Sequence, residues 1–268
     1  MKVQNKVMVV TGGGNGMGRE IVLNLLSKGA SVAAVDVNEA ALQETVKLAG
    51  DKKEKLAVFV LNITDKAAVE ALPDQVIARF GGVDGLINNA GIIQPFVRLN
   101  DLKFEAIERV LNVNLYGTLY MVKAFLPHLL KRPVAHIANV SSMGGFLPVP
   151  GQTIYGASKA AVKLLTEGLY AELLNTNVKV TVIYPGAIGT NIAANSGVSI
   201  SMGADSAEAA ARTLAPARAA EIIVNAIEQD RYSVLVGSDA KFMDFIYRLN
   251  PKFAAGFIYK QMKSLLDA

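Results

Sequence analysis

The sequence predicts a doubly wound α/β fold, in which helices cover both faces of one parallel sheet. Three observations carry this prediction. Seven short apolar runs recur along the 268 residues, longer amphipathic helical patterns separate them, and a glycine-rich loop follows the first run. Strands that are apolar on both faces and alternate with helices are typical of parallel sheets. We expect one domain, because no linker rich in Pro, Gly or Ser interrupts the series.

The predicted strands are rich in β-branched and small apolar residues. They cover residues 6–10, 31–36, 56–61, 83–88, 134–140, 178–184 and 232–236. Residues 187–215 break the alternation after the sixth strand with small and polar residues, so we expect an insertion placed like a lid over the site. We assign residues 1–240 to the domain and residues 241–268 to an amphipathic helical tail.

Composition excludes several classes of protein. An apolar content of 51% is ample for a large core, and the absence of cysteine excludes disulfides, thiol nucleophiles and Cys-based metal sites. We expect no metal. No apolar stretch is long enough for a signal peptide or a membrane span, which predicts a cytoplasmic protein. The net charge of +4 is not gathered in a dense Lys/Arg run, so we expect no nucleic-acid partner.

A glycine-rich loop, TGGGNGMG (11–18), follows the first strand. Gly12, Gly16 and Gly18 have the spacing G-x-x-x-G-x-G, and a helix is predicted to begin within the loop. Glycine permits positive φ and lets backbone N–H groups approach a phosphate, while the helix N-terminus favours its negative charge. Strand, loop and helix in this order predict a pyrophosphate site. No Lys-Ser/Thr pair closes the loop, which argues against a nucleoside-triphosphate hydrolase.

The second strand ends in Asp36, whose carboxylate can accept hydrogen bonds from both hydroxyls of a ribose and would repel a 2′-phosphate. Arg or Lys at position 15 or 37 would favour NADP, but these positions hold Asn15 and Val37. We therefore predict NAD, with NADP as the less favoured cofactor. A methyltransferase that uses S-adenosylmethionine also has a glycine loop and an acidic end to strand two, so these features alone do not name a reaction.

Six motifs then occur in one order along the chain. They are TGGGNGMG (11–18), LINNAG (86–91), NVNLYG (112–117), NVSSMGG (139–145), YGASK (155–159) and YPGAIGT (184–190). Together they resemble the short-chain dehydrogenase/reductase family over residues 5–236, nearly the whole chain. The resemblance implies a Rossmann-type dinucleotide-binding domain, disfavours the methyltransferase, and suggests a homotetramer or homodimer.

The YGASK motif places a phenol and an ammonium one helical turn apart, at Tyr155 and Lys159. A phenol with the usual pKa of about 10 is a poor base near neutrality, but a nearby lysine and a positive nicotinamide ring would lower that pKa. The resemblance implies that Tyr155 is the catalytic acid/base and that Lys159 also holds the nicotinamide ribose. It implies that Ser142 orients the substrate oxygen, and that Asn114 bends its helix and holds a water linked to the lysine. We expect Ser141 to be structural.

The resemblance also implies which residues contact the dinucleotide. They are Gly12, Asn15, Gly16, Met17, Gly18, Asp36, Asn62, Ile63, Asn89, Ala90, Gly91, Tyr155, Lys159, Pro185, Gly186, Ile188 and Thr190. The sequence departs from the family at Asn62, where an aspartate usually accepts a hydrogen bond from the adenine amino group. The amide oxygen of Asn62 can still accept this bond.

Substrate contacts are expected from the loops that follow the strands, at residues 92–99, 144–154 and 187–215. The first two loops are distinctly apolar, and no cluster of Arg or Lys awaits a phosphate or carboxylate, so we expect an apolar substrate. The predicted substrate contacts are Ile93, Phe96, Gly144, Phe146 and Gln152.

The tail carries apolar residues at helical spacing, before and after Pro251, with basic residues beside them. We favour a helix packed on its own domain or on a sister subunit. The alternatives are a flap over an apolar substrate and an anchor at a membrane surface. A second Tyr-x-x-x-Lys spacing, at Tyr259 and Lys263, lies in this tail far from any glycine loop, and we interpret it as a surface coincidence.

These features predict an NAD-dependent oxidoreductase that interconverts a secondary alcohol and its ketone on an apolar molecule, such as a steroid, terpenoid or aromatic alcohol. Within the enzyme class, the alternative is an NADPH-dependent ketone or 3-oxoacyl reductase. Outside it, the alternative is a dinucleotide-binding regulator that has lost catalysis. Such a regulator is expected to lack the tyrosine or the lysine, and both are present.

Overall fold

One parallel sheet forms the centre of the protein. In a computed structural model, which describes residues 1–198, 213–263 and 266, its strands lie in the order β3-β2-β1-β4-β5-β6-β7 and every neighbouring pair is parallel. The strands are β1 (Val7–Thr11), β2 (Ser31–Asp36), β3 (Leu56–Val60), β4 (Gly85–Asn88), β5 (Ala135–Val140), β6 (Val178–Pro185) and β7 (Ser233–Val236). The predicted fold class is confirmed, and each of the seven predicted strands is present.

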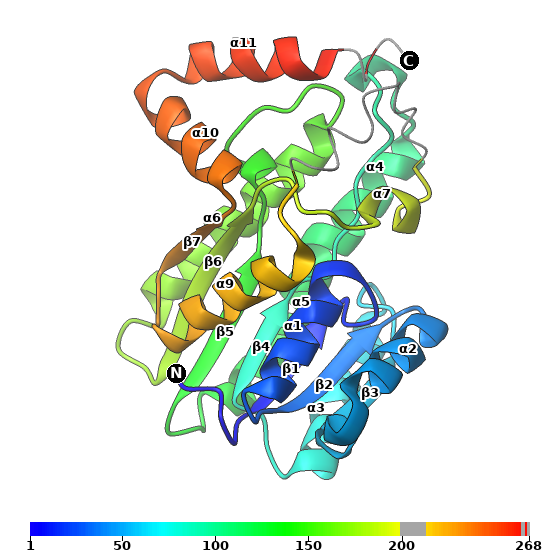
Figure 1. Cartoon of the computed structure of the whole chain (residues 1–268), viewed down its shortest axis with the longest axis vertical. Helices are drawn as coiled ribbons and strands as arrows, with labels where there is room; N and C mark the ends of the chain where they lie inside the picture. Colours follow the sequence, from blue (N-terminus) through cyan, green and yellow to red (C-terminus); the bar gives the residue numbers. More distant parts are fainter. Residues whose placement is uncertain (199–212, 264–265, 267–268) are drawn as a thin grey trace.

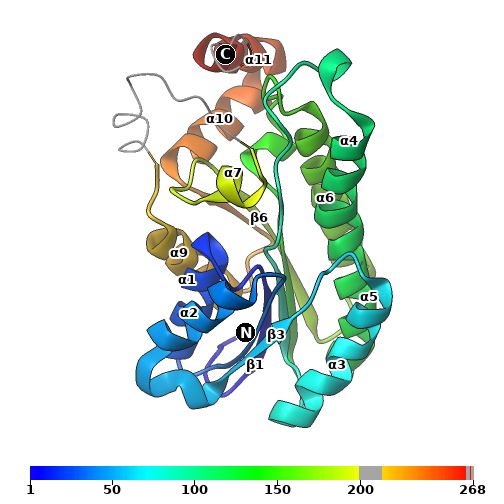
Figure 2. The ribbon, with the colours of Figure 1, turned by 90° about the vertical axis from the view of Figure 1, so that its right-hand side faces the viewer.

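Helices cover both faces of the sheet (Figures 1 and 2). One face carries α1 (Gly16–Ser27), α2 (Glu39–Ala49) and α9 (Pro216–Glu228). The other carries α3 (Lys66–Phe80), α5 (Thr118–Leu129) and α6 (Thr153–Glu172), with α4 (Phe104–Leu111) beside α6. Among the described residues, three helices lie beyond the carboxyl edge of the sheet: α7 (Ile192–Asn195), α10 (Ser238–Leu249) and α11 (Pro251–Met262).

The core has two apolar layers, one on each side of the sheet. Successive side chains of a strand point to opposite faces, so Met8 and Val10 pack in the layer under α1 and α9, while Val9 packs in the layer under α3 and α5. All three side chains are fully buried. This two-sided burial explains why the strands appear in the sequence as continuous apolar runs.

The strand order places a binding crevice at the carboxyl ends of β1 and β4. The chain proceeds from β1 outward to β2 and β3, then crosses back to β4 on the other side of β1. In open α/β sheets, ligands bind in the crevice at such a reversal of strand order. The glycine loop lies at this point, and its turn has positive φ at Gly12 (69°) and Gly16 (52°). A Cβ atom on Gly18 would lie 2.0 Å from the Gly12 carbonyl oxygen, so only glycine fits there.

The helical tail begins earlier than predicted, because α10 starts at Ser238. One face of α10 and α11 packs on its own domain, where Met243, Ala254 and Ile258 form a small core with Leu147. This inner face therefore packs as expected for a tail helix that covers its own domain. No helix in the described part of the chain is long and apolar enough to cross a membrane.

The predicted lid is described only at its two ends, since residues 199–212 lie outside the described residues. These ends pair with each other. Ile188 and Leu214 form a parallel bridge, in which the Gly189 N–H donates to the Leu214 carbonyl at 3.0 Å and the Leu214 N–H donates to the Ala187 carbonyl at 2.9 Å. The two described ends of the insertion therefore lie side by side at the end of β6.

Candidate active site

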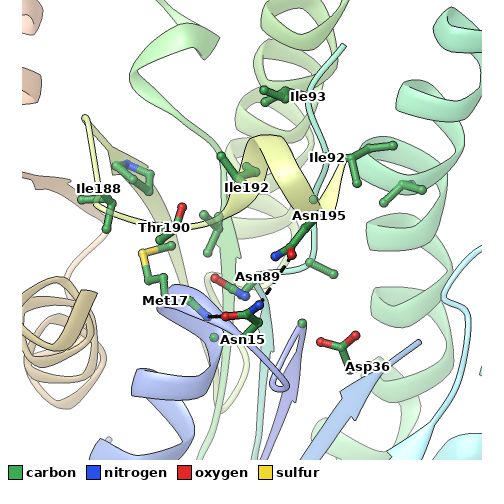
Figure 3. Close-up of a pocket in the computed structure, with 18 of the residues that line it drawn as sticks. Asn15, Met17, Asp36, Asn89, Ile92, Ile93, Ile188, Thr190, Ile192 and Asn195 are labelled. Atoms are coloured by element: carbon green, nitrogen blue, oxygen red, sulfur yellow. Dashed lines mark hydrogen bonds between the residues drawn. The ribbon is translucent and has the colours of Figure 1, made fainter. Parts of the chain in front are cut away.

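A cavity of about 530 Å³ opens at the carboxyl ends of the strands (Figure 3). Its walls come from the glycine loop, from the residues that follow β2, β4, β5 and β6, and from α7. This volume is within the range of small-molecule and cofactor sites. Every residue predicted to contact the dinucleotide lines this cavity.

The glycine loop presents the N-terminus of α1 to the cavity. The Asn15 side chain caps the helix by accepting a hydrogen bond from the Gly16 N–H at 2.7 Å. The Arg19 guanidinium holds the loop from behind through two hydrogen bonds to the Gly14 carbonyl, at 2.6 and 3.0 Å. The backbone donors at this helix end and the positive end of the helix dipole suit a phosphate group.

Asp36 lies at the far side of the same loop, where β2 ends. Its carboxylate accepts hydrogen bonds from the Gly14 N–H and the Asn38 N–H, both at 3.0 Å. Lys159 is the single Lys or Arg among the described residues that line the cavity, and it lies at the end of β5 rather than beside Asp36. None of the described residues that line the cavity therefore places a cation beside Asp36.

Asn62 lines the cavity, but its amide oxygen already has partners. This oxygen accepts hydrogen bonds from the Thr64 N–H at 3.0 Å and from the Thr64 hydroxyl at 2.9 Å. An amide oxygen has two lone pairs, and both are directed to Thr64. We expected this oxygen to accept from an adenine amino group, and the structure assigns it to a local turn instead.

Tyr155 and Ser142 meet at the floor of the cavity. Burial raises the pKa of Tyr155, and a hydrogen bond from Ser142 acts in the opposite direction. The Ser142 hydroxyl oxygen accepts from the Gly144 N–H at 3.0 Å, so its hydrogen is free to point toward Tyr155 or toward a bound oxygen. The pair can thus hand a proton to a ligand or take one from it.

Lys159 is buried beside this pair, with 4% of its surface exposed. Its ammonium donates to the Val140 carbonyl at 2.9 Å, and burial lowers its pKa to about 8. We predicted that Lys159 lowers the pKa of Tyr155. In the protein alone the pKa of Tyr155 is raised, because the loss of solvation outweighs the other influences. The expected lowering by the lysine is therefore not present in this structure.

Asn114 lies below the cavity and does not line it. It belongs to a π-helical turn (Asn112–Gly117) that joins α4 to α5, so the predicted irregularity of the helix is present. The Asn114 amide oxygen accepts from the Ile92 N–H at 2.9 Å, and its nitrogen donates to the Ile92 carbonyl at 2.9 Å and to the Ser158 hydroxyl at 3.0 Å. Asn114 thus holds the backbone of Ile92 beside α6, and its catalytic role and its link to a water stay predictions.

Gly91 explains how Lys159 and Asn114 fit together. A Cβ atom at this position would lie 3.0 Å from the Lys159 ammonium nitrogen and 3.3 Å from the Asn114 amide oxygen. A side chain there would push the ammonium away from Val140. The glycine of the LINNAG motif thus leaves room for the buried charge.

Comparison with known proteins identifies the family. The family model described as "short chain dehydrogenase" matches residues 6–199. The chain belongs to the short-chain dehydrogenase family. It is 39% identical to the putative oxidoreductase SadH of Mycobacterium tuberculosis over 254 residues, which cover 92% of this chain and 91% of the relative. As a member of the family, the protein is an NAD(P)-dependent oxidoreductase.

Solved structures share the fold. A short chain dehydrogenase/reductase from Burkholderia phymatum, in complex with NAD, superposes with a TM-score of 0.80 at 30% identity, and the match covers 88% of this chain and 90% of that chain. The structure of ElxO with NADP bound has a TM-score of 0.77 at 25% identity and covers 87% of this chain and 98% of that chain. The two similar proteins thus bind different dinucleotides.

One of the five predicted substrate contacts of this short-chain dehydrogenase lines the cavity. It is Ile93; the cavity is not lined by Phe96, Gly144, Phe146 or Gln152. Gly144 lies directly beside the tyrosine, since a Cβ atom there would be 3.4 Å from a ring carbon of Tyr155.

Two of the other predicted contacts have structural roles. Phe146 packs against Tyr184 and Tyr247, with ring centroids 5.8 and 6.0 Å apart. Gln152 is buried and donates to the Gln94 carbonyl at 2.8 Å. Both were placed near substrate because their loop is apolar, but the loop turns these two side chains into the protein.

Several cavity residues were not predicted individually. Ile92, Ala187, Ile192 and Asn195 belong to the predicted substrate loops, whereas the others were not predicted: Val35, Val37, Asn38, Ala41, Leu61, Val113, Val140 and Ser141. Many of them lie at or just after the carboxyl end of a strand, so the topological rule that located the site would have found them too. No motif marks α7. Its Asn195 reaches down to Asn15, with 3.5 Å between the two side-chain amides (Figure 3).

Burial of Lys159 predicts a specific dependence of stability on pH. Between pH 8 and the ordinary pKa of 10.5, the unfolded chain keeps a proton on this amine that the folded protein has lost. The free energy of unfolding of the protein, relative to Lys159→Met, should therefore rise over this window by up to about 3 kcal/mol. Urea unfolding of the cofactor-free proteins across this pH range measures the difference.

The control is Lys163→Met, which removes a partly exposed lysine one turn along the same helix. Its stability should stay parallel to that of the unmodified protein across the window. If the curve for Lys159→Met also stays parallel, burial does not perturb the lysine as the structure indicates.

Proposed function

We propose that this protein is an NAD-dependent dehydrogenase that interconverts a secondary alcohol and its ketone on an apolar molecule. The observation that supports this most directly is the arrangement of Tyr155, Ser142 and Lys159 on the floor of one cavity. A phenol, a hydroxyl donor and a buried ammonium are the groups needed to move one proton to or from a substrate oxygen.

The cavity suits a dinucleotide. The glycine loop and the N-terminus of α1 would hold the pyrophosphate, Asp36 would hold the adenosine ribose, and Pro185 to Thr190 would pack on the nicotinamide. The glycine loop fits a bound pyrophosphate because it leaves its backbone uncovered. A Cβ atom on Gly12 would lie 2.9 Å from the Asn89 side chain, so this position has no room for a side chain and presents backbone to the cavity. When bound, the nicotinamide supplies the hydride acceptor for alcohol oxidation.

Residues of this chain transfer the proton between the substrate oxygen and the protein. In the oxidation direction, the Tyr155 phenolate accepts the proton of the substrate hydroxyl as the carbonyl forms. Ser142 donates a hydrogen bond to the same oxygen and stabilises the charge that develops on it. Lys159, one helical turn from Tyr155 on α6, would supply a positive charge that favours the phenolate, and the positive ring of a bound nicotinamide would add to it. In the reduction direction, the Tyr155 phenol returns the proton.

Two features support the choice of cofactor and substrate. Asp36 favours NAD, as argued above, and the Burkholderia relative was solved with NAD. Ile92, Ile93 and Ile192 line the cavity, and α7 carries no Lys or Arg, which supports an apolar substrate of the steroid, terpenoid or aromatic alcohol type. An NADPH-dependent ketone or 3-oxoacyl reductase remains the alternative, because the similar protein ElxO binds NADP.

We also propose that the protein forms a homodimer or homotetramer. Phe104, Tyr116 and Leu164 are 77%, 45% and 68% exposed, and they come from α4, the π-helical turn and α6, which pack beside one another. Large apolar side chains gathered on adjoining helices favour burial against another subunit.

Tyr155→Phe should lower kcat at least about a thousandfold, because the variant keeps the ring but loses the proton donor and acceptor. A panel of secondary alcohols and ketones, followed by nicotinamide absorbance, measures the change. NAD binding should persist, which calorimetry can confirm.

The chain offers a matched control in Tyr259→Phe, because Tyr259 has the same spacing to a lysine but lies half exposed on α11. This variant should keep full turnover. Unchanged turnover in Tyr155→Phe would overturn the mechanism. Tight NAD binding without turnover of any alcohol by the unmodified protein would favour the regulator.

Asp36→Asn tests the preference for NAD. The change keeps an acceptor for the backbone of the glycine loop but removes the charge that repels a 2′-phosphate. The ratio of kcat/KM with NAD to kcat/KM with NADP should fall about tenfold or more. Asp51→Asn, on an exposed turn, should leave the ratio unchanged. A wild-type preference for NADP would contradict the assignment of Asp36.

A further inference from the structure

The N-terminus of α6 has no cap from its own sequence. The helix begins at Thr153, two residues before Tyr155, and the side chain of its N-cap residue, Gln152, makes no capping hydrogen bond. The first backbone N–H groups of a helix have no partner within the helix and must find one elsewhere. The donors of Ile154 and Tyr155 are in this position.

Gln94 supplies the missing cap from a different part of the chain. Its amide oxygen accepts from the Ile154 N–H at 2.8 Å and from the Tyr155 N–H at 3.0 Å. Its amide nitrogen donates to the Gly151 carbonyl at 2.9 Å. The side chain is fully buried, and it comes from the segment after β4 rather than from the residues next to α6.

The same segment is fixed at a second point. Asn114 holds the backbone of Ile92 on both sides, through its N–H and its carbonyl, and also bonds Ser158 of α6. Residues 92–94 are therefore fastened between the π-helical turn and α6, while Ile92 and Ile93 line the cavity. One short segment sets both the start of the catalytic helix and part of the cavity wall.

We propose that Gln94 is a positioning residue for catalysis, which fixes α6, and with it the Tyr155 phenol, relative to Ser142. The proposal rests on the proposed function of Tyr155. A shift of the helix start moves the phenol away from the Ser142 donor, whose hydrogen bond lowers the pKa of Tyr155. Loss of the cap should therefore lower turnover and raise the pH at which the base becomes active.

Gln94→Met tests this, because methionine has a similar size but cannot accept a hydrogen bond. We expect kcat to fall about tenfold to a hundredfold, with KM for NAD changed less than about threefold. The apparent pKa of the kcat profile should move upward, a change that a purely structural role would not produce. Gln94→Glu keeps an acceptor for both N–H groups and should recover part of the lost kcat.

Two other glutamines provide comparisons. Gln152→Met removes the bond to the Gln94 carbonyl but leaves both capping bonds, so its loss of kcat should be smaller than that of Gln94→Met. Gln229→Met lies on an exposed turn and should match the unmodified protein. An unchanged kcat and pH profile in Gln94→Met would overturn the proposal, as would an equal loss in Gln152→Met. If Tyr155→Phe keeps its turnover, the proposed function itself fails.

A second feature stands on separate observations, at the outer face of α10 and α11. Here large apolar side chains face away from the domain, and they are 49–71% exposed: Phe242, Phe245, Leu249, Phe253 and Tyr259. The rings of Phe242 and Phe253 both contact Phe257, at 6.3 Å between centroids, so the surface is continuous across the two helices. Figure 1 shows both helices at the end of the molecule farthest from the N-terminus.

The charge on α10 and α11 is mostly positive. From residue 241 to residue 263 the chain carries five exposed cations, Lys241, Arg248, Lys252, Lys260 and Lys263, and one acid, Asp244, which pairs with Arg248 at 2.8 Å. Asp239, in the first turn of α10, accepts from the Ala187 N–H at 2.6 Å. None of the four lysines forms an ion pair with a described residue. In a symmetric dimer the same patch meets itself, so these cations would face one another and repel.

We propose that the outer face of α10 and α11 docks on an anionic lipid surface. Interfacial helices combine Phe and Leu with flanking Lys and Arg in this way, and each cation near an anionic leaflet strengthens binding. The expected partner is thus a lipid layer with anionic headgroups at its surface and apolar acyl chains beneath them. Docking requires no membrane-spanning helix.

Cosedimentation with vesicles tests the docking surface. The protein should bind vesicles that contain phosphatidylserine and not vesicles of phosphatidylcholine alone, with binding that weakens as salt rises. Lys252→Glu/Lys260→Glu and Leu249→Ser should each reduce partitioning, the former by about tenfold or more. Turnover of a water-soluble alcohol should be unchanged in both.

Matched controls come from the opposite end of the molecule. Lys52→Glu/Lys53→Glu and Leu48→Ser alter exposed residues of the same kinds and should bind vesicles normally. Equal loss in these controls, or no binding by the unmodified protein, would overturn the proposal. A lower oligomeric mass in Leu249→Ser would assign the face to a second copy instead, and salt-dependent binding to an oligonucleotide would assign it to nucleic acid.

Discussion

The Lys159 ammonium lies in the interior of the protein, at the carboxyl end of β5, and its nearest polar partner is the Val140 carbonyl at 2.9 Å. Burial of a charge costs free energy, so the surrounding structure has to compensate. Gly91 leaves room for it, and α6 brings it to the tyrosine one turn away. Among the described residues that line the cavity, Lys159 is the single Lys or Arg, so the positive charge of this site comes from it.

The parallel sheet makes this arrangement possible. Because the strands all end at one edge, residues that are distant in the sequence meet there without long connections. The glycine loop, Asp36, Ser142 and the segment after β4 each follow a different strand. The helices that cover the two faces of the sheet then add the N-terminus of α1 and the phenol and ammonium of α6. These groups are thus carried by rigid elements, which preserves their geometry.

The pKa of Tyr155 differs from the one that its sequence neighbours predict. The spacing of Tyr155 and Lys159 indicated that the lysine would lower the pKa of the phenol, but burial raises it in the protein alone. Desolvation depends on every atom around the ring, which a spacing of four residues does not report. The same limit applies to Asn62, whose oxygen is taken by Thr64, two residues further on.

The sequence by itself determined the fold class, the seven strands, the glycine loop and many of the residues that line the cavity, because these follow from periodicity and from motifs whose order fixes their place on the sheet. Only the tertiary structure decided that Phe146 and Gln152 turn inward, that Gln94 caps α6, and that the outer face of the tail is exposed. Such contacts join residues from separate elements, and side-chain direction in a loop depends on what packs against it. No local pattern encodes that packing.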